Sequence, residues 1–186
     1  DALNNDIKYK NAPFAAPSNA QMFEMANLAY YLINLKDRGK KSSIKATFTS
    51  YLKEKSVYCK NRANYLRYIN ADNDMVQYER LQAKFLNNPS EDMIKLQALK
   101  LQVLYSFRQV FSVTDKNNES PKNIINTVPL YLYAAISAKK LLDFTDKLNN
   151  KTSDYDLQKY LSYEKKFGTY WRDKMVNEIS GLNISH

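Results

Sequence analysis

Three charged residues occupy helix positions that the surrounding pattern places inside the protein. Over residues 42–69, a turn of 100° per residue gathers the apolar side chains in one arc, and Lys55 and Arg62 fall near its centre. Glu164 interrupts an apolar stripe near the C-terminus in the same way, and Gly168 one turn later would let a neighbouring backbone approach. Leaving such a charge buried and unpaired costs roughly 3–5 kcal/mol, so each needs a partner or a route to solvent.

Two further residues extend this group. Glu24 interrupts an apolar segment, and Arg108 lies among leucines and a tyrosine. One hypothesis is a polar pocket that binds a small ligand or a partner's side chain. The alternative, which we favour, is an internal network of ion pairs and hydrogen bonds that fixes how the helices pair. Both hypotheses place the interior polar site at Glu24, Lys55, Arg62, Arg108 and Glu164.

The net charge of +9 is concentrated in one stretch. Residues 36–69 contain ten Lys and Arg against two acids, a net +8, whereas the rest of the chain has 18 basic and 17 acidic residues. Localised basicity indicates an anionic partner, with a merely solvated face as the plain alternative. We expect an acidic protein or anionic surface, and nucleic acid as a second possibility. The predicted basic face comprises Lys36, Arg38, Lys40, Lys41, Lys45, Lys53, Lys60 and Arg67.

Familiar catalytic and metal-binding patterns are missing from the sequence. The only histidine is His186, the last residue, and Cys59 is the only cysteine, so neither a His or Cys metal site nor an internal disulfide is expected. Three isolated glycines form no phosphate-binding loop. We therefore expect no cofactor and no metal, and a binding protein rather than an enzyme. A carboxylate-based enzyme that uses Glu24 or Glu164 is a third alternative.

The elements that carry these residues are predicted to be helices. Three glycines and long periodic runs favour an all-α fold, an irregular antiparallel bundle of about six helices with the apolar first helix near its centre. Residues 1–17 are expected to be an extended N-terminal segment, and residues 18–186 a single helical domain. Capping residues and apolar periodicity predict helices over 19–38, 42–69, 75–87, 89–113, 128–149 and 153–180.

No apolar run reaches the roughly 20 residues needed to cross a bilayer, so no transmembrane segment is expected. The chain begins at Asp1 without an initiator methionine, which favours an exported protein (periplasmic, cell-surface or secreted) over a cytoplasmic one. An inhibitor, an immunity-type protein, an adaptor and a surface-exposed interaction domain all fit a basic helical protein, and the oligomeric state is left open.

Overall fold

The structure is a computed structural model that describes residues 19–34, 38–116 and 121–184; within these ranges the side chains of Arg38, Arg108 and residues 111–128, among others, are not described. The predicted N-terminal segment, residues 1–17, therefore lies outside the described residues. All the elements described are helices that pack on one another, so the predicted all-α bundle is confirmed. They are α2 (Asn19–Asn34), α3 (Arg38–Tyr68), α4 (Asn73–Asn87), α5 (Glu91–Lys116), α6 (Pro121–Asn149) and α7 (Tyr155–Ile184).

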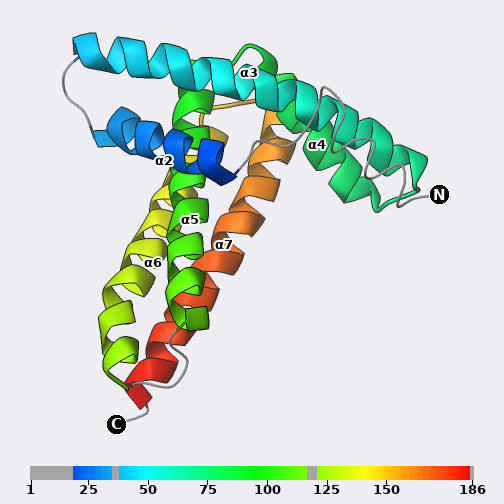
Figure 1. Cartoon of the computed structure of the whole chain (residues 1–186). Helices are drawn as coiled ribbons and strands as arrows, with labels where there is room; N and C mark the ends of the chain where they lie inside the picture. The colour runs from blue at the N-terminus through cyan, green and yellow to red at the C-terminus, as the bar shows by residue number, and fades with distance from the viewer. Residues whose placement is uncertain (1–18, 35–37, 117–120, 185–186) are drawn as a thin grey trace.

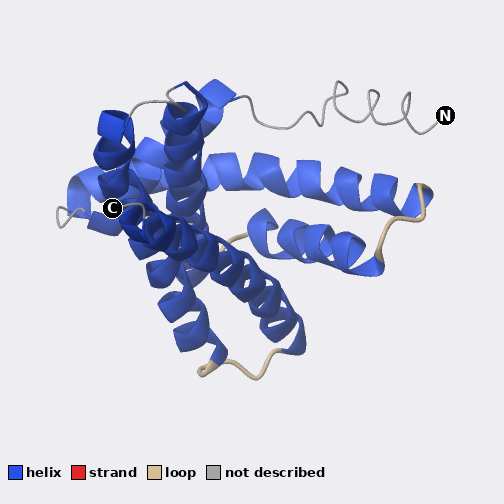
Figure 2. Cartoon of the chain, turned by 90° about the horizontal axis from the view of Figure 1, so that it is seen from below, coloured by secondary structure: helices blue, strands red, loops and turns tan. Residues whose placement is uncertain are grey.

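The helices form two connected parts (Figure 1). Helices α5, α6 and α7 run side by side as a three-helix bundle, and α3 lies across one end of it. Helix α4 packs against α3 to form a hairpin arm (residues 38–87), which projects to one side of the bundle (Figure 2). Helix α2 lies beside both α3 and α5. The chain that the sequence predicts as one bundle is thus a bundle with an arm.

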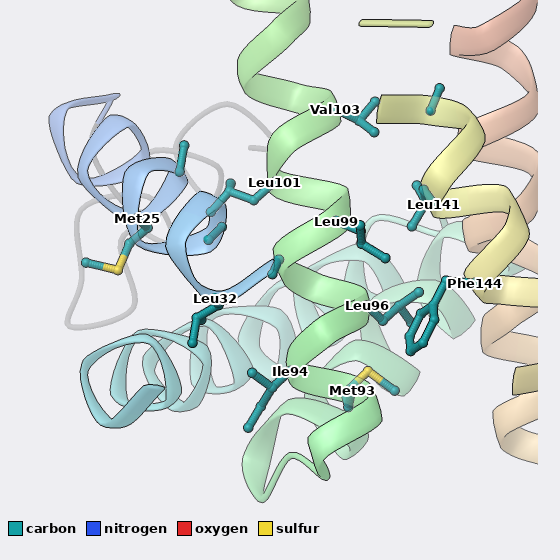
Figure 3. Packing of buried hydrophobic residues seen from close by; sticks show 14 of the residues in the cluster. Met25, Leu32, Met93, Ile94, Leu96, Leu99, Leu101, Val103, Leu141 and Phe144 are labelled. Atoms are coloured by element: carbon teal, nitrogen blue, oxygen red, sulfur yellow. The ribbon is translucent and has the colours of Figure 1, made fainter. Parts of the chain in front are cut away.

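The central helix of the fold is α5. Every residue from Leu96 to Val103 is buried, because α2, α6 and α7 all pack around this part of the helix. Figure 3 shows Leu101 pointing toward α2 on one side, while Leu96 lies beside Phe144 of α6 on the other. Five of the eight residues from Leu96 to Val103 are apolar, and the buried glutamines have hydrogen-bond partners: Gln97 donates to the Tyr160 hydroxyl at 2.8 Å and Gln102 to the Ala26 carbonyl at 2.6 Å.

Helix α2 has a more lateral position than its apolar composition indicates. Met25, Ala29 and Leu32 are buried against the core, whereas Tyr30 and Tyr31 on the other side are each 48% exposed. Tyrosine combines an apolar ring with a hydroxyl that prefers water, so it can cover the core from outside. Six apolar or aromatic residues in a row, residues 28–33, therefore do not require a central helix.

Some helix ends differ from the predicted ones. Helix α6 begins at Pro121 and keeps Pro129 in its interior, so the predicted start of this helix at residue 128 is wrong. Proline suits a first helical turn, and the pattern assigned that role to the second of two available prolines. Helix α3 continues without a break to Tyr68, and α7 continues past Gly181 to Ile184.

The arm depends on a tight turn between its two helices. Asn70 adopts a left-handed conformation (φ 55°), its N–H donates to the Arg67 carbonyl at 3.1 Å, and the Ala71 N–H donates to the Leu66 carbonyl at 2.9 Å. This pair of bonds is a Schellman motif, which ends α3 and reverses the chain. The Asp72 side chain then accepts from the Asp74 N–H at 2.8 Å and starts α4. The two helices consequently lie side by side.

Candidate anion-binding groove and a buried ion pair

The predicted basic face is spread along the whole of α3. Lys40, Lys53, Lys60 and Arg67 are exposed, and Lys41 and Lys45 are half-buried. Lys45 forms an ion pair with Glu91 at the start of α5. Lys36 lies outside the described residues, as does the side chain of Arg38.

This spread divides the basic face into separate sites. Twenty-two residues separate Lys45 from Arg67, which is roughly 33 Å along a helix. The Debye length at physiological ionic strength is about 8 Å, so a ligand beside Arg67 is screened from Lys45. A small anion therefore responds to the cations of one end of the helix.

One end of α3 contributes to a groove that it shares with α4. The groove has a volume of about 620 Å³ and is lined by two cations of the predicted face, Lys60 and Arg67. Arg80 and Lys84 of α4 line it as well, and none of the described residues that line it is acidic. Four cations from two helices thus surround one hollow. A concave surface of a single charge sign concentrates the electrostatic field and attracts ions of the opposite sign.

Small side chains make room for this groove. Ser56, Ala63 and Ala83 line it, and the hydroxyl of Ser56 donates a hydrogen bond to the Ala83 carbonyl across the two helices at 2.6 Å. A short side chain that bonds directly to the neighbouring backbone holds the two helices close together. The longer cationic side chains then form the rim of the groove.

The four cations differ in their partners. Arg67 donates to the Asn64 side chain at 3.1 Å, and Arg80 donates to the Gln77 side chain at 2.9 Å. Lys84 pairs with Asp156 of α7, with 2.7 Å between its Nζ and the carboxylate. Lys60 has no ion-pair partner among the residues that the structure describes. The α3 side of the groove therefore retains more uncompensated charge than the α4 side.

A second charged cluster is enclosed where the arm meets the bundle. The Glu164 side chain of α7 is 0% exposed, and its Oε1 lies 3.1 Å from Nζ of Lys100, which is central in α5. The same carboxylate oxygen accepts from the Tyr78 hydroxyl of α4 at 2.7 Å. Lys100 also donates to the Gln82 side chain at 3.2 Å and contacts the Tyr78 hydroxyl. The cluster thus ties α4, α5 and α7 together.

Burial controls the protonation of this cluster. Desolvation lowers the pKa of Lys100 because it disfavours the ammonium, and the Glu164 carboxylate opposes that shift. Burial and the same carboxylate raise the pKa of Tyr78 well above its ordinary value, so its hydroxyl remains a donor. Oε2 of Glu164 has no hydrogen-bond partner among the described residues. This oxygen has therefore lost its contact with water without gaining a hydrogen bond in the protein.

The interior polar residues predicted from the sequence have different positions. Glu164 is buried as expected, but Glu24 is exposed on α2, which corrects the expectation that it lies inside. Lys55 and Arg62 are half-buried, and the charge of Lys55 acts on Lys100 through space. The side chain of Arg108 is outside the described residues. The cation that pairs with Glu164 is Lys100, which the sequence reasoning missed.

The signal for Lys100 was available in the sequence. It lies four residues after Leu96 and three before Val103, on the same apolar stripe, which is the argument that identified Glu164. Arg80 and Lys84 were also missed, although their spacing of four residues places them on one face of the helix that follows the basic stretch.

Cys59 is buried, and desolvation together with Glu79 raises the pKa of its thiol to about 12, so the nucleophilic thiolate is suppressed. No set of three or more His, Cys, Asp or Glu residues that could hold a metal ion occurs within residues 19–34, 38–116 and 121–184. In the same ranges, no helix is long and apolar enough to cross a membrane.

Comparisons with protein-family models, with curated proteins and with solved structures find no match to this chain. The groove and the buried ion pair are therefore interpreted from their own chemistry.

Proposed function

We propose that this protein is a non-catalytic helical binding protein that engages an acidic protein partner through the groove between α3 and α4. The observation that carries the proposal is the set of four cations around this groove, with no acidic residue among the described residues that line it. Complementary charge across an interface increases the association rate and selects among partners. An adaptor, an inhibitor or an immunity-type protein would act in this way.

The lining of the groove favours acidic peptide side chains over nucleic acid. Proteins that bind single strands stack the bases on aromatic side chains, and no aromatic residue is among those that line this groove. Small apolar surfaces such as Val57 and Ala83 lie between the cations instead. That combination suits a polypeptide that presents carboxylates together with short aliphatic groups.

A carboxylate-based enzyme receives less support. Glu164, the most interior of the carboxylates considered, is 0% exposed, whereas a substrate must reach a catalytic acid or base to within hydrogen-bond distance. Glu24 lies exposed on α2. Binding at the surface of the arm is the simpler use of the charges that are accessible.

The test is the binding of a short fluorescein-labelled polyglutamate peptide, measured by fluorescence anisotropy. The double variant Lys60→Glu/Arg67→Glu should weaken binding by about tenfold or more, because it replaces two attractive contacts by repulsive ones. Lys139→Glu/Lys147→Glu is the matched control: both residues are exposed on α6, eight positions apart, and the change in net charge is identical. Higher salt should weaken binding to the wild-type protein.

Two results would contradict the proposal. If both double variants lose affinity equally, the net charge of the protein rather than the groove attracts the peptide. If a single-stranded oligonucleotide of equal charge binds much more tightly than the peptide and shows the same dependence on Lys60 and Arg67, the partner is nucleic acid.

A further inference from the structure

The α4 side of the groove already holds a carboxylate that belongs to the protein itself. Asp156 lies in the first turn of α7, and its Oδ2 is 2.7 Å from Nζ of Lys84. Its other oxygen is 3.8 Å from Nη2 of Arg80. Asp156 does not line the groove, so it contacts both α4 cations from behind the rim. The first turn of α7 reaches this position because it lies next to the arm (Figure 1).

The contact is accessible to solvent and therefore exchangeable. The side chain of Lys84 is 50% exposed and that of Asp156 is 27% exposed. Exposed ion pairs contribute little to stability, because water competes for both charges and two flexible side chains must be held in place. A carboxylate from another molecule can thus replace Asp156 at Lys84 without a large loss of folding stability.

The backbone of Asp156 is held in place independently of the groove. The side chain of Asp154 accepts from the Asp156 N–H at 2.9 Å and from the Leu157 N–H at 3.3 Å, and so caps α7. Contact with Lys84 also lowers the pKa of the Asp156 carboxyl, so the group is negatively charged at neutral pH. A negative charge beside Lys84 repels an incoming carboxylate that lies within a Debye length.

From this geometry we infer that Asp156 is an internal competitor, which occupies Lys84 and Arg80 until a carboxylate of the acidic partner displaces it. The inference rests on the proposed function and adds a means of regulating it. Lys60 and Arg67 on α3 are the groove cations that lie outside this ion pair, so the partner's first contacts form there. Contacts with Lys84 and Arg80 require the exchange.

The experiment uses the same labelled polyglutamate peptide with the full chain. Asp156→Asn keeps the shape of the side chain, removes the competing charge and should tighten binding about two- to fivefold, which is the range expected for one exposed ion pair. Asp146→Asn is the matched control, because Asp146 also pairs with a lysine, Lys165 at 3.1 Å, and both side chains are exposed. The control removes the same charge and should change affinity much less. Circular dichroism checks that the helices are retained, and Asp156→Ser serves if the Asn variant folds poorly.

The outcomes separate this inference from the function on which it rests. If the wild-type protein binds the peptide through Lys60 and Arg67, but Asp156→Asn binds equally well or less well, Asp156 is not a competitor and the proposed function stands. An equal gain in Asp156→Asn and Asp146→Asn also refutes competition, since net charge alone would explain it. If the wild-type protein and all variants fail to bind, both ideas are overturned.

Discussion

Two of the lysine–carboxylate pairs that connect α7 to other helices, Lys84–Asp156 and Lys100–Glu164, differ mainly in their access to water. Lys84 and Asp156 lie 2.7 Å apart at the rim of the groove, where both side chains are partly exposed. Lys100 and Glu164 lie 3.1 Å apart in the interior, where their side chains are 7% and 0% exposed. Two lysine–carboxylate ion pairs with similar nitrogen–oxygen distances are therefore found in environments of different polarity.

The environment determines what each pair can do. Water screens the exposed pair, so its charges can exchange partners at small cost, which suits a binding surface. The interior pair has lost its hydration, and its further hydrogen bonds are with Tyr78 and Gln82 of the arm. Exchange there would leave an uncompensated buried charge. The interior pair thus holds α4 on the bundle, while the exposed pair remains available to ligands.

The largest expected effect comes from breaking the interior pair. Glu164→Leu should lower the free energy of unfolding by about 3–5 kcal/mol, because Lys100 is left buried without its carboxylate. Urea unfolding followed by circular dichroism at neutral pH measures the change. The double variant Lys100→Met/Glu164→Leu should recover about 2 kcal/mol or more of that loss, since it removes both charges from the core. A double variant less stable than Glu164→Leu would show that Lys100 has a role independent of the pair.

The sequence predicts the features that depend on one helix at a time. Helix class and most helix positions follow from apolar periodicity and capping residues, and the turn at Asn70 follows from the ability of Asn to adopt left-handed backbone angles. Glu164 was found because it interrupts an apolar stripe. These signals are local in the sequence, so one helix at a time is enough to detect them.

The groove could not be predicted because it depends on which helices are neighbours. The charge count over residues 36–69 identified Lys60 and Arg67 but excluded Arg80 and Lys84, which reach the same hollow from α4. Helical periodicity gives the face on which a residue lies, but not the partner that this face meets. The pairing of Glu164 with Lys100, rather than with Lys55 or Arg62, is missing from the sequence pattern for the same reason.

An intermediate effect on stability is expected from a substitution at Gly168, where α6 packs on α7. A Cβ atom on Gly168 would lie 3.0 and 3.1 Å from Cδ2 and Cγ of Leu142, a buried side chain. Gly168→Ala should therefore lower stability by about 1–2 kcal/mol, since overpacking outweighs the gain in helix propensity. Gly181→Ala is the control, because among the described residues no atom outside its own stretch of helix lies within 4 Å of its Cβ position, and it should be neutral or raise stability by less than about 1 kcal/mol. Thermal unfolding of both variants gives the comparison; a stabilised Gly168→Ala would show that Leu142 moves aside easily.

The smallest effect on stability is expected from breaking the exposed pair, Lys84 and Asp156. The pH dependence of this effect shows that it comes from the Asp156 carboxylate. Lys84→Met should lower stability by less than about 1 kcal/mol at pH 7, because solvent screens the contact with Asp156. Lys84 lowers the pKa of the Asp156 carboxyl below 3.8 in the folded protein. As the pH falls through that range the unfolded chain binds the proton first, so this contribution is present above pH 3.8 and is lost below it.

The difference between the wild-type protein and Lys84→Met should accordingly be constant from pH 7 to pH 5 and shrink toward zero in more acidic solution. Urea unfolding of both proteins across this pH range provides the measurement, with Lys165→Met, which breaks the exposed contact with Asp146, as the control. A loss above about 2 kcal/mol at pH 7 exceeds what exposed pairs contribute. Such a loss would mean that Lys84, like Lys100, holds the arm in place, and that the groove cannot release Asp156 to admit a partner.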